Sequence, residues 1–499
     1  MTQLQDDVPA ASVPALAADI AIGRRISQLL VAHPAVVFIV LSVLFGALTM
    51  VLTPPLRGPD EPSHFLRAYG VLVGDIVPAT VDARGRKGVF IPAALHRDME
   101  LYERALYALY QDENVAFPAV LRSYARLRAE ASATPSGSPS HVFAPYAGSE
   151  GYSPVPYLPY LPALALARLL DLDFLSTFYS MRVSAFVVLT AVMAFAIAIV
   201  PHLQWPFVLI GLLPSALFSR SVLSTDAVAL ALAMMVTALA LRGARGLPTG
   251  GAWMRSLWMT LCVLCKPPQL AFILLEMMRR PPQARAWRWG AAAVVIAPAL
   301  VLSVAWVVAG AADVAAWRLV EGGTLPLEHY QPLWRLRFLL DNPWHFPRLL
   351  AGTWHYLDDY ARQLIGILGW LDMPLRRWLY PVLGAVLIAA FCAPFDLDLP
   401  TRRRLAAVAG LTVLGYALAV FLIFYLVWTG LELDQIEGVQ GRYFVVVLPL
   451  VAIIFAALLK GGLSEPSRAW TAVFGSVLGG CATLDAVLRA DWKLALLPL

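Results

Sequence analysis

The apolar residues of this chain gather in long runs separated by polar connections. Runs of about 17–25 apolar residues can cross a hydrocarbon layer about 30 Å thick. Because every backbone group in lipid must pair within its own segment, such runs have to be helices. The pattern predicts an all-α polytopic membrane protein with about nine transmembrane helices, at roughly 31–52, 178–200, 203–222, 226–242, 287–310, 376–395, 405–429, 442–460 and 469–488.

Arginines in the short connections predict the orientation of these helices. The connections 242–256 and 279–288 contain three and four arginines and no acidic residue, and three more arginines occupy 402–404. Cytoplasmic connections of membrane proteins carry an excess of Lys and Arg. We therefore expect the N-terminal tail, residues 1–30, in the cytoplasm and the C-terminus outside.

Two further apolar stretches do not fit a simple crossing. If 151–170 crossed, the arginine-rich connection 242–256 would lie outside, so we expect a helix in the outer interface instead. In 253–278 each arm around Lys266 has about 12 residues, or roughly 18 Å of helix, which is too short to cross. This stretch predicts a re-entrant hairpin with Lys266 at its tip.

Composition agrees with this reading. The chain is 59% hydrophobic and 14% charged, whereas soluble proteins are about 45–50% apolar and about 25% charged. A soluble enzyme or a nucleic-acid-binding protein is therefore excluded. The four cysteines lie in apolar stretches, and the C-x-x-C at 262–265 has no second pair, so no metal site is expected.

The predicted topology gathers the polar segments on the outer side. A long loop, 53–153, follows the first helix, and a second outer segment spans 311–375. Between them, 154–310 holds the interfacial helix, several spans and the hairpin, while 376–499 holds the last spans. Convergence of polar segments from distant parts of the chain indicates an outward-facing site.

The strongest local signal is RGPDEPSHFLRAYG at 57–70. Asp60 and Glu61 are adjacent carboxylates held between prolines, which stiffen the chain. A carboxylate at this boundary can act as a general base or help to hold a divalent cation. The alternative is a helix start in which Asp60 is the N-cap and Glu61 lies in the first turn. His64 follows as a candidate for contact with the substrate.

Three cations are candidate ligands of a phosphate group. Lys266 lies in an apolar segment, where an ionisable residue is a functional candidate by default; alternatively it pairs with a carboxylate or extends toward the head groups. Arg442 begins a span, and its planar fork suits a phosphate, although an interfacial anchor is the alternative. Arg220, near the outer end of a span, can bind a phosphate or lipid head groups.

Other polar residues are candidates for contacts with a bound molecule. Trp370 and Asp372 share a Gly- and Pro-bounded turn, GILGWLDMPL; an indole beside a carboxylate can stack on a sugar ring, although an interfacial tryptophan is common. Asp226 follows Ser224 and Thr225, which makes a position in the first helical turn the stronger interpretation. Tyr152 is a further candidate.

The order of several motifs resembles a family of bacterial membrane proteins that carries only a domain-of-unknown-function label and is grouped with the GT-C glycosyltransferases. The motifs are PDEPSHFLRAY (59–69), YSPVPYLPYLP (152–162), LPSALFSRSVLSTDA (213–227), CKPPQ (265–269), GWLDMPL (369–375) and GVQGRYF (438–444). The resemblance covers most of the chain, from the first span to about residue 450. It implies a GT-C-like helical bundle with the site on the periplasmic face of the bacterial inner membrane.

The resemblance also implies a reaction. GT-C enzymes transfer a sugar from a polyprenyl phosphate or diphosphate carrier, with inversion, to a glycan, lipid or protein acceptor. Their first outer loop carries an acidic catalytic residue, matched here by Asp60 or Glu61. A required divalent cation is not supported, and nothing matches a peptide-binding element. A transporter or flippase of lipid-linked sugars, and a polysaccharide polymerase or ligase, are the alternatives.

Overall fold

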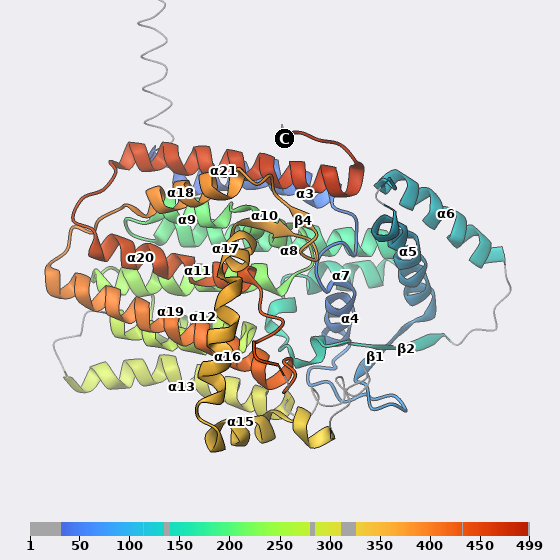
Figure 1. Ribbon diagram of the computed structural model, residues 1–499, viewed down its shortest axis with the longest axis horizontal. Coiled ribbons are helices and arrows are strands. Elements are labelled where there is room, and N and C mark those ends of the chain that lie inside the picture. Colours follow the sequence, from blue (N-terminus) through green and yellow to red (C-terminus); the bar gives the residue numbers. More distant parts are fainter. Residues whose placement is uncertain are drawn as a thin grey trace, which may run out of the picture.

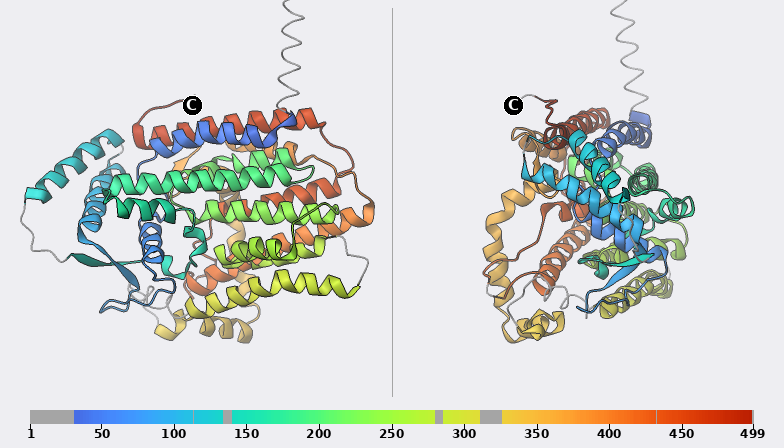
Figure 2. Two further views of the ribbon diagram at one scale, coloured as in Figure 1. Left: turned by 180° about the vertical axis from the view of Figure 1, so that it is seen from behind. Right: turned by 90° about the vertical axis from the view of Figure 1, so that its right-hand side faces the viewer.

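Long helices run side by side through the molecule, and their connections gather at two ends (Figures 1 and 2). The computed structural model describes residues 31–112, 114–133, 140–279, 285–310, 326–431 and 433–497. Within these ranges seven helical segments are long and apolar enough to cross a membrane: Pro34–Leu52, Phe174–Ile199, Thr225–Ala244, Gly290–Gly310, Leu399–Val427, Gly441–Leu458 and Glu465–Trp492. They correspond to seven of the nine predicted spans.

Some of these segments combine several elements. The first consists of α2 (Pro34–Leu41), the π-helical η1 (Ser42–Gly46) and α3 (Ala47–Leu52). The others are α8 (Phe174–Ile199), α11 (Thr225–Ala244), α13 (Arg285–Gly310), α19 (Leu399–Val427), η7 (Gly441–Val447) with α20 (Leu448–Leu458), and α21 (Glu465–Val487) with η8 (Leu488–Trp492).

Two predicted spans take a different form. The stretch 203–222 contains two helices, α9 (Gln204–Gly211) and α10 (Pro214–Ser221), because Pro214 lacks an N–H group and its ring interrupts a continuous helix. The stretch 376–395 contains α18 (Leu379–Phe391), which has only 13 residues. Seven of the about nine predicted transmembrane helices thus appear as long apolar helices in the described ranges, and the full number stays a prediction.

The stretch 253–278 folds back on itself. Helix α12 (Ala252–Cys265) is followed by the 3₁₀ helix η4 (Pro267–Met278), and Lys266 between them is extended. The α region is disfavoured for a residue that precedes proline, so α12 ends before Lys266. Arg255 Nε lies 3.1 Å from Glu276 Oε1 and ties the two open ends together. Lys266 is thus the tip of a hairpin, whose depth in a bilayer stays a prediction.

The loop 53–153 is folded. It contains α4 (Glu61–Leu72), β1 (Gly88–Pro92), α5 (Ala93–Gln111), α6 (Phe117–Ala133) and β2 (His141–Pro145). The antiparallel pairing of β1 with β2 runs from Gly88↔Pro145 to Pro92↔His141 and closes the segment that holds α5 and α6. Figure 1 shows α5 and α6 together at one end of the molecule.

The stretch expected in the outer interface begins with short elements. After η2 (Ser149–Gly151) and η3 (Val155–Tyr157), α7 (Leu161–Leu169) has nine residues. At 1.5 Å per residue this is about 14 Å, too short to cross a membrane. The helix packs against α8.

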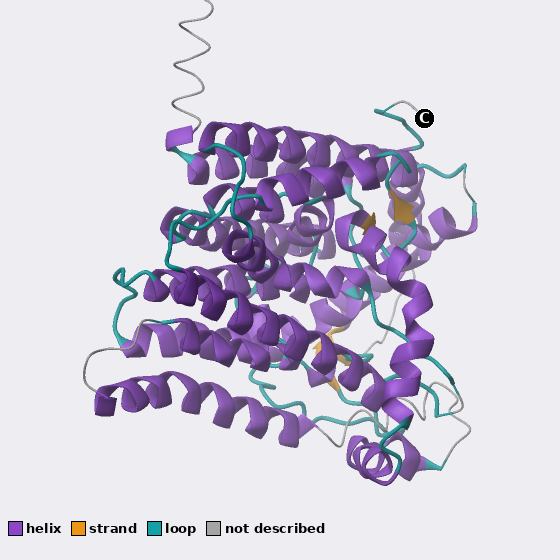
Figure 3. Cartoon of the chain, turned by 60° about the vertical axis from the view of Figure 1, so that its left-hand side comes forward, coloured by secondary structure: helices purple, strands orange, loops and turns teal. Residues whose placement is uncertain are grey.

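The second outer segment is described from residue 326, and the predicted part 311–325 lies outside the described residues. It contains η5 (Leu327–Tyr330), α15 (Pro332–Asp341), α16 (His345–Thr353), η6 (Trp354–Tyr356), α17 (Leu357–Gly366), β3 (Ile367–Leu368) and β4 (Met373–Pro374). The pair β3–β4 is antiparallel. Figure 3 shows that strands are a minor part of a helical fold. The structure therefore agrees with the all-α prediction apart from these two small sheets.

Arginines of the basic connections bind the C-terminal ends of neighbouring helices. Arg242 donates to Ile199 O at the C-terminus of α8 over 3.0 Å, and Arg402 donates to Ala457 O near the C-terminus of α20 over 2.7 Å. Cationic side chains are favourable at helix C-termini, where carbonyl groups lack partners. Which end of the bundle faces the cytoplasm stays a prediction.

Candidate functional site

An ion cluster joins three segments that are distant in the sequence. Asp226 in the first turn of α11 pairs with Lys266 at the hairpin tip, and Arg442 Nε at the start of η7 lies 3.3 Å from Asp226 Oδ2. The Ser224 side chain caps α11 by accepting from Asp226 N over 3.1 Å, which places Asp226 in the first turn as expected. The sequence proposed all three charged residues separately, and the structure brings them together.

Tyr443 is an aromatic support for both cations. Lys266 Nζ lies 5.1 Å from the centre of its ring, and the Arg442 guanidinium carbon lies 5.6 Å from the same point. The ring also stacks on Phe424 at 5.4 Å. Cations held over an aromatic face are attracted to its π electrons, so Tyr443 keeps the two positive groups close to one another.

Asp60 lies beside this cluster at the start of α4. Its backbone is left-handed, with φ 56°, and its exposed carboxylate makes no capping hydrogen bond, so the helix-cap alternative is not realised by its side chain. Although the side chain is exposed, surrounding protein atoms raise the pKa of the carboxyl above its ordinary value. Arg442 opposes this rise, Asp226 adds to it and Lys266 opposes it.

His64 and Tyr152 border the same cluster. Nδ1 of His64 lies 3.1 Å from the Tyr157 hydroxyl, and its ring meets the Tyr152 ring edge-on at 5.5 Å. Burial, with the charge of Lys266 in addition, lowers the pKa of His64 to about 3. His64 is therefore neutral at physiological pH, where it can serve as a hydrogen-bonding group.

Glu61 faces away from this cluster and has no exposed surface. Its carboxylate accepts from Gly58 N at 2.8 Å and from Leu223 N at 2.7 Å, and it pairs with Arg182 of α8 at 2.8 Å. A carboxylate whose lone pairs are occupied in this way cannot take a proton from a substrate. We therefore correct the candidate catalytic role of Glu61 to that of a positioning residue.

Arg220 does not lie where the predicted ligand of a phosphate group would have to lie. It is fully buried, donates to Ser42 Oγ over 3.0 Å, and lies over the rings of Phe38 and Phe186 at 5.0 and 5.5 Å. Its side chain packs against the first span and α8, with no contact to the ion cluster among the described residues. Arg220 is therefore removed from the candidate site.

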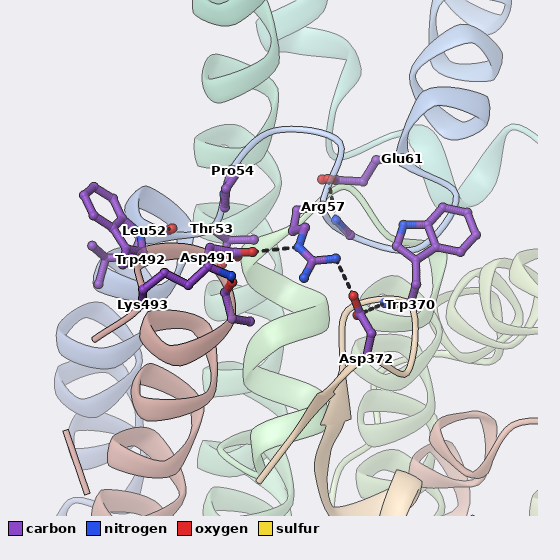
Figure 4. A network of polar contacts seen from close by, with 12 residues as sticks. Leu52, Thr53, Pro54, Arg57, Glu61, Trp370, Asp372, Asp491, Trp492 and Lys493 are labelled. Carbon is purple, nitrogen blue, oxygen red and sulfur yellow. Dashed lines mark hydrogen bonds and ion pairs between the residues drawn. The ribbon is translucent and has the colours of Figure 1, made fainter. Parts of the chain in front are cut away.

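Trp370 and Asp372 belong to a second polar network, shown in Figure 4. Arg57 links Asp372, at 2.5 Å, to the fully buried Asp491, at 2.7 Å. Asp372 also accepts from Trp370 N over 3.0 Å, which fixes the turn between β3 and β4. Half-exposed Trp370 remains available for contacts, whereas Asp372 is engaged with Arg57, and this weakens its predicted role in binding sugar.

The sequence interpretation missed several of these residues. Arg182 carried a usable signal, because a cation inside an apolar span is costly unless it is paired. Arg57 begins the motif RGPDEPSHFLRAYG, but its partners are more than 300 positions away. Tyr443 carried no distinguishing signal. In the described ranges, no group of three or more His, Cys, Asp or Glu side chains is arranged to hold a metal.

The stacked apolar helices and the convergent charges at one end define a polytopic helical membrane protein with a polar site where several chain segments meet. The chain belongs to the family described as "Predicted membrane protein (DUF2142)", which matches residues 43–451. No curated protein and no solved structure matches the chain.

Proposed function

We propose that this protein is a GT-C-type glycosyltransferase of the bacterial inner membrane that uses a polyprenyl-phosphate-linked sugar on the periplasmic face. The observation that supports this most is the convergence of Asp60, Asp226, Lys266 and Arg442 from four separate segments. A candidate base beside two cations could take a proton from an acceptor and stabilise a departing phosphate, which are the two tasks of displacement at an anomeric carbon.

In the proposed reaction Asp60 takes the proton of an acceptor hydroxyl. The acceptor oxygen bonds to the anomeric carbon from the face opposite the leaving group, so the configuration inverts. The bond between that carbon and the phosphate oxygen breaks, and its electron pair leaves with the carrier phosphate. Lys266 and Arg442 stabilise the negative charge that develops there. The raised pKa of Asp60 favours this role, because a general base works best when its pKa approaches the operating pH.

The remaining residues define where the substrates would lie. His64 and Tyr152 border the ion cluster and are suited to contact the sugar or the acceptor, which can be a glycan, a lipid or a protein. Trp370 offers an exposed indole at the same end of the bundle. The hydrophobic carrier would approach from the surrounding membrane lipids, between the apolar helices.

The test is release of the carrier phosphate. Purified protein in lipid nanodiscs is incubated with labelled polyprenyl-phosphate sugars and candidate acceptors, and free polyprenyl phosphate is measured. Transport alone releases none, so carrier translocation without release would favour a flippase and refute the proposal.

Asp60→Asn is the decisive variant, since Asn tolerates a left-handed backbone as well as Asp does. It should reduce turnover about 10²–10⁴-fold, the usual contribution of a general base. Asp171→Asn is the matched control, because Asp171 is likewise exposed and left-handed, with φ 50°. Full activity of Asp60→Asn would contradict the proposed mechanism.

A further inference from the structure

Asp226 serves two cations at once. Its Oδ1 pairs with Lys266 Nζ, and its Oδ2 lies 3.3 Å from Arg442 Nε. The three side chains retain between 11 and 15% exposed surface, so the cluster is largely shielded from bulk solvent. A carboxylate that faces two cations offsets part of the positive charge of each.

The cations have further capacity for an anion. Arg442 Nε is buried and makes no hydrogen bond among the described residues, because its ion pair with Asp226 is out of line for one. Buried donors are nearly always satisfied, so the ion pair with Asp226 uses the Nε donor of Arg442 only incompletely. An arginine fork and a lysine ammonium together match the oxygens of a phosphate group.

The charges of the cluster limit what that acceptor can carry. Lys266 and Arg442 contribute two positive charges, Asp226 and an ionised Asp60 contribute two negative ones, and His64 is neutral. The cluster therefore has no net charge before a ligand arrives. A phosphodiester would add one uncompensated negative charge, and a diphosphate ester would add two. Uncompensated charge is costly where water is largely excluded.

We propose that Asp226 is an internal counter-ion occupying the place of the donor's phosphate, and that the cluster selects a singly charged phosphodiester over a diphosphate. This inference rests on the proposed function for the nature of the donor. On binding, the phosphate oxygens accept from Lys266 and Arg442, and Asp226 gives up part of its contact with both. Lys266 and Arg442 are thus kept paired, and in position, while the site is empty.

The test is a binding measurement that needs no turnover. Wild-type protein and Asp226→Asn, in zwitterionic nanodiscs, are titrated with a polyprenyl phosphodiester sugar and with the corresponding diphosphate. The wild type should bind the phosphodiester more tightly. Asp226→Asn should bind both ligands more tightly, with the diphosphate gaining roughly tenfold or more, because each ligand charge no longer meets the repulsion of a nearby carboxylate.

Two controls separate this effect from general damage. Asp226→Glu keeps the charge and should keep the wild-type preference. Glu276→Gln removes a carboxylate that also faces two arginines, Arg255 and Arg279, at the other end of the same hairpin, and should leave the preference unchanged. If Asp226→Asn is too unstable for titration, its melting temperature should rise more with phosphodiester than that of the wild type.

Equal or weaker binding of both ligands by Asp226→Asn would overturn the proposal, since it would make Asp226 a simple structural partner. Phosphatidylglycerol and inorganic phosphate are added as separate probes. If phosphatidylglycerol binds as tightly as the polyprenyl ligand, the assignment of the ligand to a lipid-linked sugar is refuted, while the counter-ion exchange stands. Selective binding without carrier release would refute the proposed transfer reaction and leave this inference intact.

Discussion

The buried pair of Glu61 and Arg182 is the feature most open to a quantitative test. Both side chains are fully buried, and the carboxylate accepts from Arg182 and from two backbone N–H groups, those of Gly58 and Leu223. Gly58 lies two residues before Asp60, and Leu223 lies three residues before Asp226. Glu61 therefore connects the two segments that carry the candidate acidic residues.

Replacing Glu61 by Gln removes the charge that neutralises Arg182 and turns an amide donor toward groups that are themselves donors. Breaking a buried pair on one side typically costs about 3–5 kcal/mol. The amide oxygen of the glutamine can still accept a hydrogen bond, and Arg182 keeps its hydrogen bonds to Thr53 O and Pro54 O at 2.7 and 3.0 Å. We therefore expect a loss near the lower end, about 3 kcal/mol in the free energy of unfolding.

The assay is equilibrium unfolding in mixed micelles, carried out as a double-mutant cycle with Arg182→Met. A coupling energy of about 2 kcal/mol or more is expected between the two sites, because each single variant leaves its partner charged and buried. Glu130→Gln, at an exposed pair with Arg126, should lose less than about 1 kcal/mol. A loss at Glu61 as small as that of this control, or a coupling near zero, would refute the reasoning.

Three other predictions concern the same region. Gly58→Ala should destabilise by about 1–3 kcal/mol through overpacking, because a Cβ there would lie 2.8 Å from Glu61 Cδ and from Val222 Cβ, whereas Gly151→Ala, with open space around it, should be neutral in thermal unfolding. The raised pKa of Asp60 should place the acid limb of the turnover–pH profile above the ordinary carboxyl value, and His64→Gln should leave that limb in place. Because the folded state holds the Asp60 proton more tightly than the unfolded state, stability should fall as pH rises through this range. The Asp60→Asn variant should then melt no lower than the wild type at neutral pH, and the melting temperatures of the two proteins should converge at acidic pH. A lower melting temperature of the variant at neutral pH would contradict the pKa shift.

Local signals in the sequence predicted the parts of the fold that depend on local chemistry. The apolar runs gave most of the long helices, the proline pair after Lys266 indicated the break in the hairpin, and Ser224 indicated the start of α11. The interruption at Pro214 is also visible in the sequence, although the apolar length of 203–222 predicts a single span. Helix breaking by proline holds inside an apolar segment as well.

The sequence alone could not predict the direction in which these side chains point, nor the pairing of residues that are distant in the chain. Asp60 and Glu61 are adjacent, but the left-handed backbone at Asp60 lets one remain open while the other turns inward to Arg182. Arg220 stands one turn from a helix end, as a phosphate ligand would, and packs instead between two phenylalanine rings. The partners of Asp372 were equally hidden, since Arg57 lies 315 positions away.

The ion pair between Arg255 and Glu276 fixes how far the ammonium group of Lys266 stands from the base of the hairpin. Eleven positions separate Arg255 from Lys266, and ten separate Lys266 from Glu276, so the ammonium stands roughly 16–20 Å above the tied base along the two arms. One residue added to α12 would lift this group by about 1.5 Å and swing it by roughly 100° around the helix axis. The number of residues in each arm therefore sets how far the positive charge reaches toward Asp226, and a relative with longer or shorter arms would hold this charge at a different height above the tied base.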